Sequence, residues 1–381
     1  MTSRPIPVPR PRRHLTDAQR LAWLRLIRSE NVGPVTFREM LNQYGGAEAA
    51  LAALPELSRR GGRRRALKIC EIADADREIA AADAAGARLV ALDELGYPPL
   101  LAVIEAPPPV LYFAGRSELL DHPIVAIVGA RDASAAGRKI AGQIARDLGR
   151  AGAVVASGLA RGIDTAAHEG ALASGTVAVV AGGIDVAYPP ENAGLQARIK
   201  QDGALIAECA PGLEPRGKDF PRRNRLISGM ALGVLVVEAA VRSGSRITAD
   251  YAKEQGRQVF AVPGNPLDPR AGGTNQLLKQ GAGLVTDAAD ILGALSLLKG
   301  SLTITSQISE PDATVLGSQM PDIAQSDRER VVEALGAAPV ALDDLVRATG
   351  VAVRDVRVVL LELDIAGRID RSPGQRIALR P

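Results

Sequence analysis

Six short apolar runs in the middle of the chain are the feature that most constrains its fold. They lie at residues 124–128, 153–157, 176–181, 204–207, 233–238 and 258–262. Stretches with helical periodicity lie between or after them, at residues 134–150, 162–173, 192–202, 245–256 and 287–298. Continuous apolar strands that alternate with amphipathic helices are typical of a parallel sheet covered by helices on both faces. The pattern predicts an α/β, Rossmann-like, doubly wound, mostly parallel sheet.

The regions on either side of this pattern predict two further domains. Residues 16–88 have helical spacing, and their Gly33-Pro34 turn is similar to a helix-hairpin-helix, although a plain helical hairpin explains it equally well. Helices at 327–335, 342–349 and 353–366, then a hairpin turning at 372–375, predict a winged helix. The expected order is a disordered basic tail (1–15), a helical domain (16–88), an extended Rossmann-like domain (89–298), a linker (299–325) and a winged-helix domain (326–381).

Composition limits the classes of function. Hydrophobic residues make up 46% of the 381 residues, and the formal net charge is +3. This mildly basic balance permits nucleic-acid binding without establishing it. No apolar run reaches the ~18 residues of a membrane span, and the N-terminus lacks an apolar signal region, which predicts a cytoplasmic protein. The two cysteines have no metal or redox spacing, and no second ligand accompanies His168, so neither a metal nor a cofactor is expected.

Glycine, serine and arginine gather at the positions where the predicted strands end. These residues are Gly129, Arg131, Ser157, Arg161, Arg242, Ser243 and Arg246. Because the carboxyl ends of parallel strands meet at one edge of a sheet, we expect these side chains to surround one binding site. Gly129 would let the backbone approach a ligand closely, and the helix that Ser134 caps would favour an anion.

The most basic segment runs from Phe220 to Gly229, directly before the fifth strand. It contains Phe220, Arg222, Arg223, Asn224 and Arg225. Guanidiniums can bind phosphates through two N–H groups at once, and an aromatic ring such as Phe220 or Tyr188 can stack on a base. The segment therefore predicts a site for an extended anionic ligand. Asn224 is either a contact to a base or sugar, or a helix cap.

Two pairs of titratable residues at the same edge have structural interpretations. Asp164 and His168 are four residues apart, which favours a hydrogen bond between them on one helix face. Asp185 and Glu191 could form a carboxylate pair, but a turn-stabilising role is favoured for Asp185. The chain lacks both the G-x-G-x-x-G spacing and a Walker A lysine, which argues against dinucleotide binding and NTP hydrolysis.

In this order, the motifs resemble those of the DNA-processing protein A family (DprA, also called Smf). The matching blocks are Gly129-Ala130-Arg131 and residues 157–164, 182–192, 220–229, 237–239, 243–249 and 260–264. The resemblance implies a protein that binds single-stranded DNA without marked sequence preference and loads the recombinase RecA onto it in natural transformation. It also implies a SAM-like fold for the N-terminal helical domain (16–88), a homodimer and no enzymatic activity. Arg131 and the block from Arg222 to Arg225 carry over as DNA contacts.

Two alternatives to this function remain open. The Gly272-Gly273-Thr274 turn is similar to part of the Pro-Gly-Gly-x-Gly-Thr-x-x-Glu pattern of nucleotide phosphoribohydrolases, which cleave N-glycosidic bonds. No glutamate stands among residues 275–278, which argues against hydrolysis. The other alternative is an adaptor whose basic edge docks an acidic protein. Elsewhere, the basic cluster at residues 59–68 is expected to be solvated, and the nearly charge-balanced winged helix is expected to bind a partner or to regulate.

Overall fold

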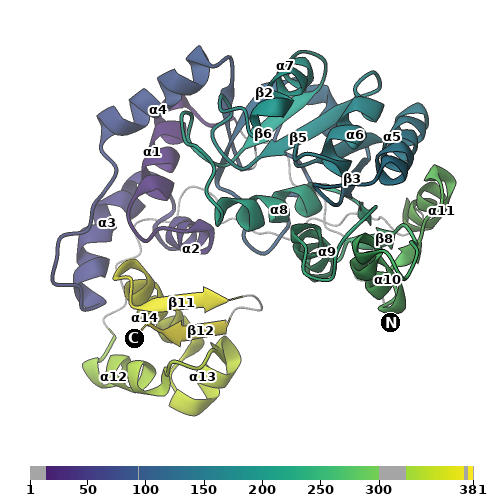
Figure 1. Cartoon of the computed structure of the whole chain (residues 1–381). Coiled ribbons are helices and arrows are strands. Elements are labelled where there is room, and N and C mark those ends of the chain that lie inside the picture. Colours follow the sequence, from purple (N-terminus) through teal and green to yellow (C-terminus); the bar gives the residue numbers. More distant parts are fainter. Residues whose placement is uncertain (1–13, 93, 300–322, 373–375, 381) are drawn as a thin grey trace. The chain divides into compact units, whose positions relative to one another are not determined.

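The structure is a computed structural model that describes residues 14–92, 94–299, 323–372 and 376–380 (Figure 1). The chain divides into two compact units. The sheet unit contains Arg77–Gln307, and the helical unit combines Leu15–Asp76 with Ile308–Pro381, each as far as it is described. Most of the predicted tail and linker lies outside the described residues, as do residues 373–375 of the predicted hairpin turn.

The sheet unit is built on one nine-stranded sheet with the strand order β1-β2-β6-β5-β4-β3-β7-β8-β9. The strands are β1 Arg88–Ala91, β2 Val110–Gly115, β3 Ile124–Val128, β4 Val154–Ser157, β5 Thr176–Val180, β6 Ala204–Ala207, β7 Gly233–Val236, β8 Gln258–Ala261 and β9 Gly283–Leu284. All pairs from β6 to β9 are parallel, so the predicted doubly wound, mostly parallel sheet is confirmed. The antiparallel strands β1 and β2 extend it at one edge and lie outside the six predicted apolar runs.

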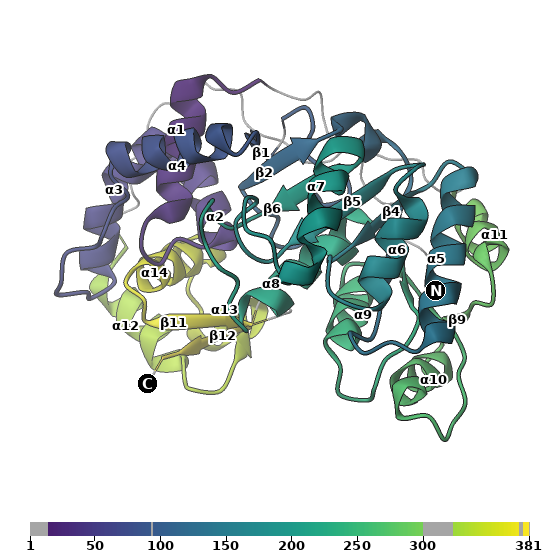
Figure 2. The ribbon, with the colours of Figure 1, turned by 45° about the horizontal axis from the view of Figure 1, so that its top comes forward.

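Helices cover both faces of this sheet (Figures 1 and 2). One face carries α5 Ala135–Arg150, α6 Ile163–Ala171, α7 Ala193–Asp202 and α11 Ala288–Lys299. The other face carries α8 Asp219–Met230, α9 Gly244–Glu254 and α10 Gly272–Lys279. Val125 and Ile127 of β3 pack in the first core, while Ile124, Ala126 and Val128 pack in the second. Because successive side chains alternate between two covered faces, the strand has to be apolar throughout.

The order of the strands brings the loops of the sheet unit together. The chain builds β4, β5 and β6 on one side of β3, then crosses through α8 to build β7, β8 and β9 on the other side. Helix α8 contains the basic segment, whose helical structure was not foreseen. Its first turn follows the loop after β6, so residues from Phe220 onward start at the carboxyl edge of the sheet.

The helical unit combines the N-terminal helices with the winged helix. The N-terminal helices are α1 Asp17–Arg28, α2 Pro34–Tyr44 and α3 Ala47–Arg60, and α4 Ile72–Ala84 leads on to the sheet unit. The winged helix consists of α12 Gln325–Ala334, α13 Leu342–Thr349, α14 Val353–Ile365, β10 Val340–Ala341, β11 Ile369–Ser372 and β12 Arg376–Leu379. Leu361 and Ile365 of α14 are buried in the same core as Leu54 and Leu57 of α3. The two domains, distant in sequence, thus share a core.

No helix within the described ranges is both long enough and apolar enough to cross a membrane.

Candidate nucleic-acid interface

A pocket of about 220 Å³ lies where the loops after β3, β4, β5 and β6 meet. Its lining includes the predicted site residues Arg131, Arg161, Phe220 and Arg223, together with Tyr188. The remaining lining residues are Gly158, Ala160, Val180, Ala181, Gly182, Val186, Pro189, Pro190, Glu191 and Pro215. The structure therefore gathers three arginines and two aromatic rings at one place, from the loops after β3, β4 and β5 and from the start of α8.

The aromatic rings and Arg131 contact one another at this pocket. The Arg131 guanidinium carbon lies 5.0 Å from the centroid of the Phe220 ring, and the Tyr188 and Phe220 centroids are 5.4 Å apart. A cation over a ring contributes about 0.5–1 kcal/mol where it is exposed. Tyr188 is 44% exposed. The ring faces and the Arg131 charge are thus held in place beside a solvent-accessible cavity, an arrangement suited to a planar base attached to a phosphate.

Arg223 forms the buried part of the pocket. Its side chain donates to the carbonyl oxygens of Gly158 (2.6 Å) and Val179, and to Oδ1 of Asn224 (3.2 Å). Burial lowers the pKa of Arg223 to about 10, partly opposed by Asp164, so the guanidinium stays charged at neutral pH. Only 6% of the residue is exposed. Arg223 was predicted as a surface contact, but it supplies a fixed positive charge from below the pocket.

The predicted Asp164–His168 hydrogen bond is wrong. The Asp164 carboxylate accepts from the backbone N–H groups of Gly158 (3.1 Å) and Ala160 (3.3 Å), which shapes the loop after β4. His168 instead pairs through Nδ1 with the Thr176 hydroxyl at 2.7 Å, a partner that no local sequence pattern indicates. Burial raises the pKa of Asp164 to about 6 and lowers that of His168 to about 3, so the histidine is neutral. The interpretation of Asp185 is confirmed, since its Oδ1 accepts from the Gly212 N–H at 2.8 Å in a turn.

Arg222 and Arg225 lie on α8 outside the pocket lining and share one carboxylate. Arg222 donates to both oxygens of Glu208, at 3.2 and 3.0 Å, and Arg225 donates to Oε1 at 2.6 Å. Arg225 also donates to the Ala106 carbonyl, and only 13% of its side chain is exposed, against 52% for Arg222. One carboxylate between two guanidiniums leaves one net positive charge, which the more exposed Arg222 presents. The predicted contacts at these two positions are therefore partly neutralised within the protein.

Two further predicted site residues have structural roles instead. Gly129 lies against α6, where a Cβ would come within 2.6 Å of the Ile163 side chain, so packing and not ligand approach explains this glycine. The Ser157 hydroxyl is fully buried and donates to the Ile127 carbonyl at 2.6 Å. The prediction that the Ser157 side chain contacts a ligand is thus wrong.

Asn224, Ser243 and Arg246 lie where α8 meets the start of α9. Asn224 donates to the Gly244 carbonyl at 3.2 Å, so it ties the two helices together and is not a helix cap. The Ser243 and Ser245 hydroxyls are 2.9 Å apart, and Arg246 donates to the Val241 carbonyl. None of these three residues lines the pocket.

A carboxylate occupies the helix terminus that was expected to favour an anion. Glu238 follows β7 and accepts from the backbone N–H of Ser134 (2.9 Å) and from its hydroxyl (2.6 Å), while Ser134 caps α5 by accepting from the Gly137 N–H. A Cβ at Gly137 would lie 2.5 Å from the Glu238 carboxyl carbon. The Glu238 carboxylate therefore already occupies the N-terminus of α5, so the arginines are the groups that can bind a ligand phosphate.

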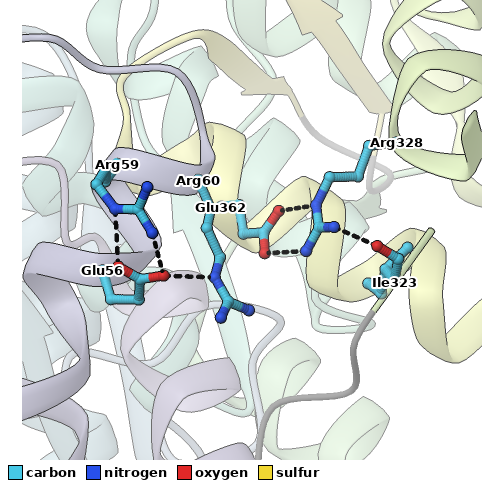
Figure 3. Close-up of polar contacts among 6 residues, drawn as sticks. All are labelled: Glu56, Arg59, Arg60, Ile323, Arg328 and Glu362. Carbon is cyan, nitrogen blue, oxygen red and sulfur yellow. Dashed lines mark hydrogen bonds and ion pairs between the residues drawn. The ribbon is translucent and has the colours of Figure 1, made fainter. Parts of the chain in front are cut away.

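The remaining candidate sites do not join the pocket. Thr274 of the phosphoribohydrolase-like turn is buried and donates to the carbonyl of Ala271, the residue directly before α10. Within the described parts of the chain, no group of three or more His, Cys, Asp or Glu residues could hold a metal ion. In the helical unit, Arg59 and Arg60 both donate to Glu56 (Figure 3). These guanidiniums lower the pKa of Glu56 to about 2, as expected for a paired, solvated surface cluster.

Comparisons with known proteins cover the whole domain order. The family model described as DNA recombination-mediator protein A matches residues 88–296. The models described as DprA-like N-terminal HHH domain and DprA winged helix domain match residues 17–81 and 318–375.

Individual relatives agree with these matches. Protein Smf of Synechocystis is 31% identical over 407 residues, covering 96% of this chain and 100% of that protein. The DNA processing protein DprA of Streptococcus pneumoniae is 45% identical over 198 residues, covering 51% of this chain and 70% of that protein. The X-ray structure of S. pneumoniae DprA superposes with a TM-score of 0.60 at 33% identity, covering 74% of this chain and 98% of that one. The chain thus belongs to the DNA recombination-mediator protein A family, whose members include proteins named DprA and Smf.

Proposed function

We propose that this protein binds single-stranded DNA without strong sequence preference at the pocket of the sheet unit. The observation that carries the proposal is the convergence of Arg131, Arg161 and Arg223 with the rings of Phe220 and Tyr188. A flexible single strand can turn a base toward the rings while its phosphates meet the arginines, and every base has a face that stacks. A duplex keeps its bases stacked and paired, so it could use only the phosphate contacts.

Fluorescence anisotropy with single-stranded oligonucleotides of different sequence tests this proposal. The logarithm of the affinity should fall with the logarithm of salt concentration, with a slope of about −0.7 per neutralised phosphate. Phe220→Leu keeps the apolar volume but removes the ring, and should cost roughly 1–3 kcal/mol for one stacked base. Tyr251→Leu, which changes a ring on α9 outside the pocket lining, is the control. A flat salt response, or equal affinity in both variants, would refute the site.

Family membership supports two finer proposals. The protein would load the RecA recombinase onto single-stranded DNA during DNA uptake and recombination, and it would act as a homodimer. Loading is tested by RecA filament formation on DNA precoated with single-strand-binding protein, which should be faster with this protein than without it. Light scattering of the purified protein tests the dimer. A monomer at micromolar concentration would contradict that part alone.

We further propose that the protein is not an enzyme. The phosphoribohydrolase-like turn lacks a glutamate within the next four residues, and its threonine donates to the Ala271 carbonyl directly before α10. Incubation with nucleoside monophosphates should release no free base, and a released base detected by chromatography would revive the hydrolase alternative. If the protein is instead an adaptor, an acidic protein occupies the pocket. A second acidic protein should then displace it, and an oligonucleotide should not.

A further inference from the structure

The third helix of the winged helix, α14, is buried on more than one side. Val356, Val359 and Leu363 pack into the core of the winged helix itself. Leu361 and Ile365 pack instead among the N-terminal helices, and both are at most 1% exposed. In a helix-turn-helix fold, the second helix of the motif is the one that enters the DNA major groove. Here α13 and α14 form that motif, so part of the DNA-reading helix lies inside a protein core.

Polar contacts fasten the end of α14 to the helical hairpin of α1 and α2. The Thr36 hydroxyl in the first turn of α2 donates to the Asp364 carboxylate at 2.7 Å. Asn31, in the turn before α2, donates to the Ile365 carbonyl at 3.0 Å and so satisfies an otherwise unpaired group at the end of α14. An internal carboxylate therefore lies at the hairpin, beside the helix start whose N–H groups would otherwise face a phosphate.

The wing is fastened to the same surface through arginines. Arg371 of β11 donates to both oxygens of Glu39 on α2, at 3.2 and 2.9 Å, and to Asp364 at 3.0 Å. Arg368 donates to the Gly61 carbonyl at the end of α3. Two guanidiniums beside the third helix thus donate hydrogen bonds to the N-terminal domain, and Arg371 also donates to α14 itself.

The helix backbones also approach closely at Gly61. A Cβ on Gly61 would lie 2.1 Å from the Glu362 carbonyl oxygen and 2.7 Å from the Ala366 Cβ. The Glu362 side chain is held on the other side by Arg328, through two bonds of 3.1 Å (Figure 3). Only glycine permits this contact, although its φ of −67° is open to any residue.

We propose that the helical domain masks a duplex-DNA-binding surface of the winged helix, which opens when α3 and α14 separate. Arg354 and Arg357 lie on exposed positions of α14, two turns and one turn before Leu361 on the same helix face. Separation would uncover Leu361 and release Arg368, and it would free Arg371 from Glu39 while Arg371 keeps its bond to Asp364 of α14. The exposed surface would then combine a groove-sized helix with arginines on both the helix and the wing, and its partner is the phosphate backbone of double-stranded DNA.

A single added methyl group tests the masking in the full chain. Gly61→Ala should force α3 from α14, whereas Gly46→Ala, at the other end of α3, meets no atom within 4 Å and serves as the control. We expect faster hydrogen exchange in residues 358–365 and tighter binding to a short blunt duplex only in Gly61→Ala. The salt slope should steepen by roughly 0.9, for the one phosphate that the released Arg368 can neutralise. Single-stranded DNA binding should stay at the wild-type value, because the pocket belongs to the sheet unit.

Other outcomes overturn the proposal. Faster exchange without a gain in duplex binding would make the contact purely structural, and unchanged exchange would mean that α3 and α14 are not in contact. If Arg357→Gln, made alone in the otherwise wild-type chain, weakens duplex binding, α14 already binds DNA without separation from α3 and is not masked. If fluorescence of Trp23, the single tryptophan, shows that Gly61→Ala unfolds the helical unit, Glu39→Gln and the exposed control Glu48→Gln decide by the same two readouts.

Discussion

Glu208→Gln should weaken the sheet unit and, at the same time, strengthen its binding to single-stranded DNA. The carboxylate is 9% exposed and accepts three hydrogen bonds from two arginines. A neutral amide keeps an acceptor oxygen at the Oε1 position, where it still faces both arginines, but it loses the negative charge and turns its NH2 group toward the Arg222 Nε–H. Water can replace the bond lost at Arg222, whose side chain is 52% exposed, whereas the Arg225 side chain is 13% exposed and keeps only an uncharged acceptor there. A hydrogen bond to a charged group contributes about 1.5–3 kcal/mol and one between neutral groups about 1 kcal/mol, so the unfolding free energy should fall by roughly 1 kcal/mol.

The gain in binding follows from the local charge. Loss of the carboxylate raises the net charge of the cluster from one to two, so one more phosphate can be neutralised. The log–log salt slope should therefore become steeper by about 0.7. Asp268→Asn removes the same charge from an exposed pair with Arg270 and is the matched control. The reasoning is refuted if both variants have equal stability, or if Glu208→Gln leaves the salt slope unchanged.

The stability measurement can be confined to the sheet unit. Trp23, the single tryptophan, lies in the helical unit, in edge contact with Phe37 at 5.0 Å. Its fluorescence therefore reports unfolding of the helical unit, while far-ultraviolet circular dichroism reports both units. In urea, the part of the dichroism change that occurs without a fluorescence change belongs to the sheet unit, and Glu208→Gln should shift that part alone.

Two further predictions concern the floor of the pocket. The pKa of His168 is lowered to about 3, so the unfolded state binds its proton first, and the stability that the neutral histidine contributes is lost as the pH falls below its ordinary pKa of 6.5. The pKa of Asp164 is raised to about 6, so the folded state binds that proton first and gains stability over part of the same range. The two effects oppose each other. Asp164→Asn should therefore steepen the acid destabilisation between about pH 6 and pH 4, by up to about 1.4 kcal/mol per pH unit, in urea titrations at stepped pH; an unchanged slope would contradict this. Gly158→Ala places a Cβ 2.7 Å from the Arg223 guanidinium and should weaken single-stranded DNA binding about tenfold in anisotropy, if one charge-assisted contact is lost. Gly194→Ala, with no atom within 4 Å, should bind like the wild type, and equal affinities would argue against a role for Arg223.

Six strands, β3 to β8, and most helices of the sheet unit could be predicted because burial on two faces leaves a local pattern in the sequence. Every residue of β3, β4, β5, β6 and β7 is buried, and apart from Ser157 at the end of β4 and Thr176 at the start of β5 each of these strands is an apolar run. Helix α8 left a weaker mark, because the side chains of Arg223 and Asn224 are buried and polar. The buried face of α8 therefore lacks the apolar periodicity from which an amphipathic helix is predicted.

The gathering of residues at the pocket could be predicted from topology, but the charges that face one another could not. Parallel strands bring Arg131 and Arg161 to one edge regardless of side-chain detail. Glu208 is fourteen residues from Arg222, and Glu238 is 104 residues from Ser134, so nothing in the local sequence marks them as partners. A glutamate directly after a predicted strand, opposite an arginine-rich block, is the one signal that could have pointed to Glu208. The contacts of Arg371 with Glu39, 332 residues away, left no such signal.

The shared core of the helical unit has a consequence for the order in which the newly made protein can fold. Leu54 and Leu57 emerge from the ribosome roughly 300 residues before Leu361 and Ile365, which at 5–20 residues per second is about 15–60 s. During this interval the sheet unit can acquire its native fold, while the first helices still expose the apolar surface that α14 will cover. Nascent chains that stall inside the last domain would thus carry an adhesive patch at their opposite end, a natural target for chaperones.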